Sequence, residues 1–159
     1  MHTKLFTFIA IGLFVALLSF DHAEAQRKPK EELNKLPCKA AVSYLMKQVM
    51  GGISKCSKTM KFKNQKERTA KMNCILKCVM ISEGILNPDG TADVATVKAF
   101  VDREVPEKFI GKVMPMVSNC IDDPKVKLDP TEEYCKSYEP PIKCLMDQMP
   151  TFCEKNPDL

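Results

Sequence analysis

The sequence predicts an all-α fold of about six helices, and three observations support this prediction. Apolar residues recur at intervals of three and four, as on the buried face of an amphipathic helix. Alternating apolar and polar runs rich in β-branched residues, which are typical of strands, are absent. Proline and glycine residues fall at helix-length intervals. We therefore expect one helical domain with no interdomain linker.

The N-terminal segment has the features of a secretory signal peptide. Lys4 precedes an apolar run over residues 5–20, and Ala23-Glu24-Ala25 has the small-x-small pattern of a cleavage site. A membrane anchor is the alternative, but the run falls short of the ~20 residues that span a bilayer. We expect residues 1–25 to be removed and residues 26–159 to form a secreted, extracellular domain without stable membrane insertion.

The first half of this domain predicts three helices. Residues 37–50 form the first, which should stop at Gly51-Gly52, with a continuation as far as Cys56 left open. The second should run from Asn64 to Gly84, with Asn64 as N-cap and Glu67 as its capping-box partner. A turn at residues 87–90 then precedes a third helix over residues 92–105, which we expect Thr91 to cap.

The second half predicts shorter and more irregular helices. Pro106 suits the first position of a helix that extends to residue 121, and Pro115 should kink it. Asp129-Pro130 should open a short helix through Cys135, which Pro140-Pro141 interrupts before a last helix over residues 142–149. Pro150 should end that helix.

Composition excludes several kinds of active site. Both histidines, His2 and His22, lie in the segment expected to be removed. The remaining chain therefore lacks the histidine of a Ser-His-Asp or Cys-His site, and a histidine-dependent zinc site or pH switch is excluded as well. In a secreted chain, the few aromatic side chains argue against nucleic acid as a partner. We expect no enzymatic activity and no cofactor.

The chain has eight cysteines, and all of them lie after residue 25. An even number in a secreted chain predicts four disulfides, each contributing about 2–4 kcal/mol of stability. A zinc site is disfavoured, because Cys74 and Cys78 have no second close pair to complete it. Their spacing places both sulfurs on one helical face, so their helix is expected to be a central one, tied to two others.

The cysteine spacing resembles that of the insect odorant-binding protein family. Three residues separate Cys74 from Cys78 and eight separate Cys135 from Cys144, which are the most specific marks of that family. The intervals of 41 residues between Cys78 and Cys120, and of 14 residues between Cys120 and Cys135, also fit. The segment "CILKC…EGILNPDG" is similar to the family's third helix and the turn that follows it. The resemblance implies helices around an internal hydrophobic cavity, with interlocked disulfides.

The family's bridging pattern joins the first cysteine to the third, the second to the fifth and the fourth to the sixth. The resemblance thus implies the pairs Cys74–Cys135 and Cys120–Cys144. Cys78 should then be bridged to the family's first cysteine. We choose Cys56 for that position, and Cys38 is the alternative. The gap to Cys74 is 17 residues from Cys56 and 35 residues from Cys38. With Cys56–Cys78, the remaining pair is Cys38–Cys153, an additional bridge.

The implied cavity should be walled by apolar side chains on the inward helix faces and by the C-terminal tail. Ten methionines in the chain support a wall that adapts to its ligand, although most of them are expected to fill gaps in the core. The expected ligand-binding residues are Leu45, Val49, Met80, Val97, Val101, Phe109, Val113 and Val117, with Met149 and Phe152 from the tail.

The resemblance implies a carrier of small hydrophobic molecules, such as odorants or pheromones, which could pass its ligand to an olfactory receptor. The alternative is a salivary, venom or haemolymph protein on the same frame that sequesters mediators or binds a protein partner. A membrane-active saposin-like domain is a third hypothesis, but it requires different cysteine spacing. We expect a monomer or weak homodimer. Without histidine, acid-triggered release would depend on carboxylates such as Asp122, Asp123 or Asp147, so a weak pH dependence is expected.

Overall fold

The computed structural model describes residues 28–121, 126–157 and 159. This part of the chain contains eight α-helices, one 3-10 helix and no strand, which confirms the all-α prediction. The predicted signal peptide, residues 1–25, lies outside the described residues. Among the described helices, none has both the length and the hydropathy needed to cross a bilayer.

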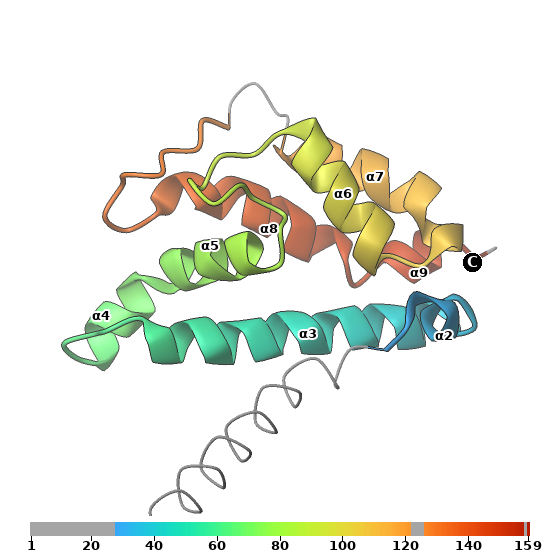
Figure 1. Ribbon diagram of the computed structural model, residues 1–159, viewed down its shortest axis with the longest axis horizontal. Helices are drawn as coiled ribbons and strands as arrows, with labels where there is room; N and C mark the ends of the chain where they lie inside the picture. Colours follow the sequence, from blue (N-terminus) through green and yellow to red (C-terminus); the bar gives the residue numbers. More distant parts are fainter. Residues whose placement is uncertain (1–27, 122–125, 158) are drawn as a thin grey trace, which may run out of the picture.

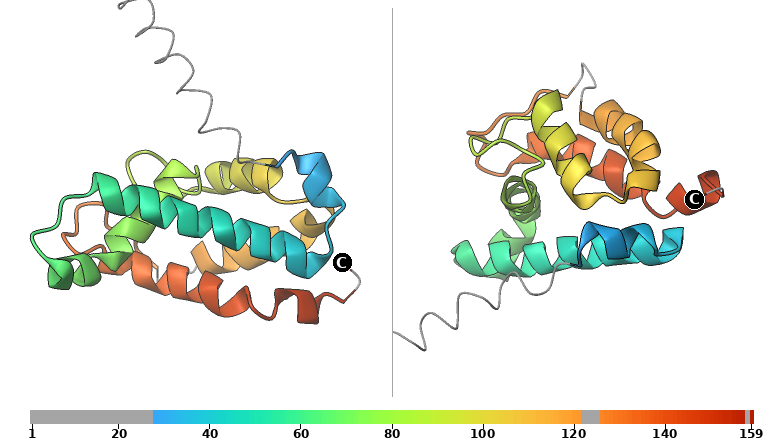
Figure 2. Two further views of the ribbon diagram at one scale, coloured as in Figure 1. Left: turned by 90° about the horizontal axis from the view of Figure 1, so that it is seen from below. Right: turned by 45° about the vertical axis from the view of Figure 1, so that its right-hand side comes forward.

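Three layers of helices make up the structure. The elements in chain order are α2 (Lys30–Asn34), α3 (Cys38–Thr59), α4 (Gln65–Ala70), α5 (Met72–Ser82), α6 (Val94–Glu104), α7 (Glu107–Ile121), the 3-10 helix η1 (Lys136–Tyr138), α8 (Glu139–Gln148) and α9 (Phe152–Lys155). Figure 1 shows α3 along one side, α6 and α7 on the other, and α5 and α8 between them. In the view from below in Figure 2, α6 and α8 lie on opposite sides of α3, and α9 lies at the end of the molecule where α3 begins.

The prediction that the first helix stops at Gly51-Gly52 was wrong. Helix α3 continues through both glycines to Thr59. A Cβ at position 52 would lie 2.9 Å from Cγ1 of Val79, so Gly52 allows α5 to approach α3 closely. At position 51 a Cβ would meet nothing within 4 Å. Gly52, but not Gly51, therefore serves the contact between the two helices.

The predicted second helix is two helices. Asn64 caps α4 as expected, because its side chain accepts a hydrogen bond from the backbone N–H of Glu67 at 2.9 Å. The carboxylate of Glu67 accepts from the N–H of Lys63 rather than from that of Asn64. The backbone leaves helical geometry at Lys71, with ψ of 22°, before α5 begins. After α5, Gly84 adopts a φ of 73°, as expected for a helix stop.

The turn predicted at residues 87–90 is confirmed, but the cap of the next helix was assigned to the wrong residue. Gly90 has a φ of 88°, and its N–H donates to the Asn87 carbonyl. The Thr91 hydroxyl donates to Asp89 within the turn, so Asp93 caps α6 instead, accepting from the N–H of Thr96 at 2.8 Å. Hydrogen bonds from the Asn87 side chain and from Thr96 lower the pKa of Asp93 to about 2.

The region around Cys135 differs from prediction. Residues 129–135 form turns rather than a short helix, and Cys135 has a φ of 52°, in the left-handed region. Pro140 and Pro141 do not interrupt a helix, because they occupy the first turn of α8, where a missing N–H breaks no intrahelical bond. Pro115 lies inside α7, which continues to Ile121. Helix α9 follows Pro150 and was not expected from the sequence.

All eight cysteines are bridged. The pairs are Cys38–Cys153, Cys56–Cys78, Cys74–Cys135 and Cys120–Cys144. They confirm the three pairs expected from the family's bridging pattern and the additional bridge Cys38–Cys153. They tie α5 to α3 and to the segment before η1, α7 to α8, and the start of α3 to α9. Disulfides therefore link all the long helices except α6, which packs against α7.

The two glycines of α3 offer a matched test of the helix contact. We expect Gly51→Ala to raise the free energy of unfolding by about 0.5–1 kcal/mol, because an exposed helical glycine costs conformational entropy. Gly52→Ala should give no such gain, since its methyl group meets Val79. Urea unfolding of both variants measures the difference. Equal stabilisation by both would show that the close approach to Val79 imposes no constraint.

Removing the bridge between the ends of the domain tests the role of α9. In the double variant Cys38→Ala/Cys153→Ala, the unfolded chain loses a closure over 115 residues. We expect the free energy of unfolding to fall by roughly 2–4 kcal/mol. Urea unfolding under non-reducing conditions measures this, with free-thiol titration to show that the other three bridges remain intact. An unchanged midpoint would mean that α9 is held without the bridge.

Candidate functional site

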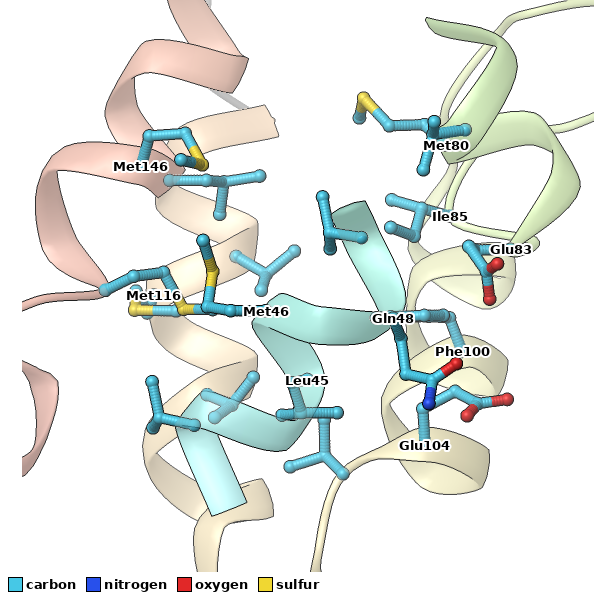
Figure 3. Close-up of a pocket in the computed structure, with 18 of the residues that line it drawn as sticks. Leu45, Met46, Gln48, Met80, Glu83, Ile85, Phe100, Glu104, Met116 and Met146 are labelled. Atoms are coloured by element: carbon cyan, nitrogen blue, oxygen red, sulfur yellow. The ribbon is translucent and has the colours of Figure 1, made fainter. Parts of the chain in front are cut away.

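An apolar cavity of about 190 Å³ lies between the helices (Figure 3). Its walls come from α3, α5, α6, α7, α8 and α9 and from residues directly after α5, α6 and α8. The lining residues are Val42, Leu45, Met46, Gln48, Val49, Leu76, Val79, Met80, Glu83, Ile85, Phe100, Glu104, Val105, Phe109, Val113, Met116, Val117, Ile142, Leu145, Met146, Met149 and Phe152. All but three of these side chains are apolar.

Helix α3 presents one continuous face to the cavity. Leu45 and Val49, which the sequence predicted, both line it. Val42 and Met46 lie on the same face, at the i, i+3, i+4 and i+7 positions of an amphipathic helix. The spacing that pointed to the first pair could therefore have identified the second.

Helix α7 and the tail form the wall near α9. Phe109, Val113 and Val117 line the cavity from α7, as expected, and Met149 and Phe152 line it from the tail. The rings of Phe109 and Phe152 meet edge to face, with centroids 6.0 Å apart. Because Cys153 is bridged to Cys38, the residue next to it, Phe152, is held in this wall.

Two of the expected residues lie outside the cavity. Val97 and Val101 of α6 are 3 % and 0 % exposed, and they belong to the core cluster that also contains Val105 and Val117. That cluster combines residues of α3, α6, α7 and α9, so these two side chains are packed among neighbours and do not border the cavity. Phe100, from the adjacent face of α6, lines the cavity instead, and Met80 of α5 lines it as expected.

Methionines make up an unusual share of the wall. Five of them line the cavity: Met46, Met80, Met116, Met146 and Met149. Met114 packs on the core behind it and Met72 is 41 % exposed. A methionine side chain is unbranched and polarisable, so this wall can fit apolar molecules of different shapes.

Three polar side chains lie together at one side of the cavity. Figure 3 shows Gln48, Glu83 and Glu104 near Phe100 and on the side opposite Met116. Arg103 links the two glutamates: its Nε lies 2.6 Å from Oε1 of Glu104, and its Nη2 donates to the carbonyl of Glu83. The Glu104 side chain is only 17 % exposed. No sequence pattern indicated this group.

The chemistry of the site is that of apolar binding. In the described ranges, His, Cys, Asp and Glu side chains form no group of three that could hold a metal ion. Every cysteine is bridged, so the chain offers no thiol nucleophile. Asp147 is exposed and pairs with Lys143 at 2.7 Å, away from the lining, while Asp122 and Asp123 lie outside the described residues.

The family model for the PBP/GOBP family matches residues 38–148 of the chain. The matched segment runs from the start of α3 to the end of α8, so it contains seven of the eight cysteines and most of the cavity wall. Neither the curated proteins nor the solved structures include a match to this chain.

Two valines allow the cavity to be separated from the core. Val113→Phe should fill the cavity and weaken binding of an apolar fluorescent probe at least about tenfold, with a small change in stability. Val101→Ala should lower the free energy of unfolding by roughly 1–3 kcal/mol, because it leaves a hole in the packed core. It should affect probe binding little. Probe titration and urea unfolding of both variants check this, and unaltered binding by Val113→Phe would count against the cavity as the probe site.

Proposed function

Since the chain belongs to the PBP/GOBP family of insect odorant-binding proteins, we propose that it is a secreted carrier of small hydrophobic molecules. Proteins of this family bind odorants and pheromones. For this chain, the proposal is that such a ligand, or one similar to it, is held in the cavity and carried through an extracellular fluid.

The observation that supports this proposal most directly is the apolar cavity. An apolar ligand that moves from water into such a space gains roughly 25 cal/mol for each Å² of apolar surface removed from water. The wall of Leu, Val, Ile, Met and Phe side chains supplies that environment. Few polar groups lie in it, so shape and hydrophobicity would dominate the choice of ligand.

We propose further that the protein is not an enzyme and takes no cofactor. The family consists of binding and carrier proteins. The polar residues of the cavity are one amide and two carboxylates. Arg103 contacts the carboxylate of Glu104 and the backbone carbonyl of Glu83. We therefore propose that this group stabilises the fold and contacts the ligand.

Four disulfides support the extracellular location, because such bridges persist in oxidising compartments. In that setting, transfer of the ligand to an olfactory receptor is part of the proposed function. Action as a monomer or weak homodimer is also part of the proposal.

Displacement of a fluorescent probe tests the proposal. Oxidised protein comprising residues 26–159 should bind N-phenyl-naphthylamine, and volatile alcohols, esters or aldehydes should displace it at about micromolar concentrations. Native mass spectrometry of protein purified from its source should show a retained small molecule and four bridges. If no apolar probe binds, while a host protein or biogenic amine binds tightly, the protein sequesters mediators or binds a protein partner instead. Leakage of vesicles in its presence would indicate a membrane-active domain.

A further inference from the structure

Methionine is the side chain of this protein that reacts most readily with mild oxidants. The chain has no tryptophan, and both histidines lie in the segment expected to be removed. All eight cysteines are bridged, so no free thiol is present to react first. Nine of the ten methionines lie after residue 25. A peroxide that meets the secreted protein therefore acts on methionine.

Exposure divides these nine methionines into two groups. Met50, Met72 and Met146 are 61 %, 41 % and 46 % exposed, whereas the other six are buried or half-buried. A dissolved oxidant must reach the sulfur atom, so the three exposed methionines should react first. Of these three, only Met146 lines the apolar cavity, because Met50 and Met72 lie outside its wall. The side chain of Met146 thus meets both the solvent and the ligand site.

The surroundings of Met146 within the cavity are apolar. Figure 3 shows it on the same side of the cavity as Met46 and Met116, whereas the three polar side chains of the wall lie on the opposite side. Ile142 and Leu145 of α8 line the same cavity. None of these four neighbours in the wall has a side-chain hydrogen-bond donor. A polar group formed at Met146 would therefore gain no hydrogen bond from their side chains.

Oxidation would form such a polar group. The sulfur lone pair attacks one oxygen of the peroxide, the O–O bond breaks, and the thioether becomes a sulfoxide as water is released. Sulfur loses two electrons and the peroxide gains them. If the new S=O group stays in the wall, an apolar ligand must lie against an unpaired acceptor; if it turns to water, it draws the side chain out of the wall. Both arrangements weaken the binding of an apolar ligand.

We propose that Met146 is an oxidation site through which peroxides lower the affinity of the protein for apolar ligands. Met50 and Met72 are oxidised without this effect, because their side chains lie outside the cavity wall. This inference rests on the proposed function, since it concerns the regulation of the same cavity.

The test measures sulfoxide formation and ligand binding in the same samples. Protein comprising residues 26–159, with its four bridges intact, is treated with hydrogen peroxide, and peptide mass spectrometry gives the sulfoxide fraction at each methionine. Titration with N-phenyl-naphthylamine gives the affinity. The unaltered protein is compared with Met146→Leu and with the control Met50→Leu/Met72→Leu. Leucine is close to methionine in volume and has no sulfur to oxidise.

We expect Met50, Met72 and Met146 to be converted before Met80, which is 7 % exposed. As sulfoxide accumulates at Met146, the probe affinity of the unaltered protein and of the control should fall at least about fivefold. Met146→Leu should bind the probe nearly as well as the unaltered protein and should keep that affinity after treatment.

A second pair of variants tests the same residue without an oxidant. Met146→Gln introduces a polar side chain of similar length into the wall, so it should bind the probe more weakly from the start. Met50→Gln makes the same change outside the wall, and it should bind the probe as the unaltered protein does.

Three results would overturn the inference while leaving the carrier function intact. Equal loss of affinity in Met146→Leu and in the unaltered protein would mean that another residue is the sensitive one. Conversion of Met146 without loss of affinity would show that the cavity tolerates the sulfoxide, and failure of Met146 to react would show that it is not an oxidation site. If the probe does not bind the untreated, unaltered protein, the carrier function itself fails and this inference fails with it.

Discussion

The two disulfides of α5 are the constraint on which the rest of the structure depends. Cys74 and Cys78 point to one side of the helix, and they fasten it to the segment before η1 and to α3. Helices around an empty apolar space would ordinarily shift inward, because close packing gains dispersion energy and removes the cost of a cavity. Covalent links oppose that collapse, and they destabilise the unfolded chain as well. The cavity can therefore persist in a domain of this size.

The same links decide which side chains form the cavity wall. The bridge from Cys38 to Cys153 fixes α9 beside the start of α3, so Phe152 reaches the ring of Phe109. The wall near α9 is thus made by two segments far apart in the sequence. Methionines give the remaining wall some freedom of shape, while Gln48, Glu83 and Glu104 lie together at one side of it. A rigid frame with an adaptable lining suits a carrier that must hold a ligand and also release it.

Local sequence patterns predicted the helices and several of their ends correctly. Asn64 caps α4, Gly84 follows the end of α5, and Gly90 ends a turn, because each depends on backbone geometry within a few residues. Predictions failed where a distant residue decides the outcome. From the sequence, Gly52 predicts the end of a helix. In the structure, it lies within a helix and gives room to the side chain of Val79. Pro140 was expected to interrupt a helix. In the structure, Cys135 has a left-handed backbone conformation and a new helix begins at Glu139, so Pro140 lies in the first turn of that helix.

For the site, the sequence by itself determined the apolar faces of the helices, so Leu45, Val49 and Phe109 could be expected in the wall. Helical periodicity records that a side chain is buried, but it does not say whether a neighbour or an empty space lies opposite. Only the tertiary structure decided that Val101 is packed within the core and that Phe100 lines the cavity. It alone brought Gln48, Glu83 and Glu104 to one side of the cavity, because side chains distant in the sequence are brought together only by helix packing and the four bridges.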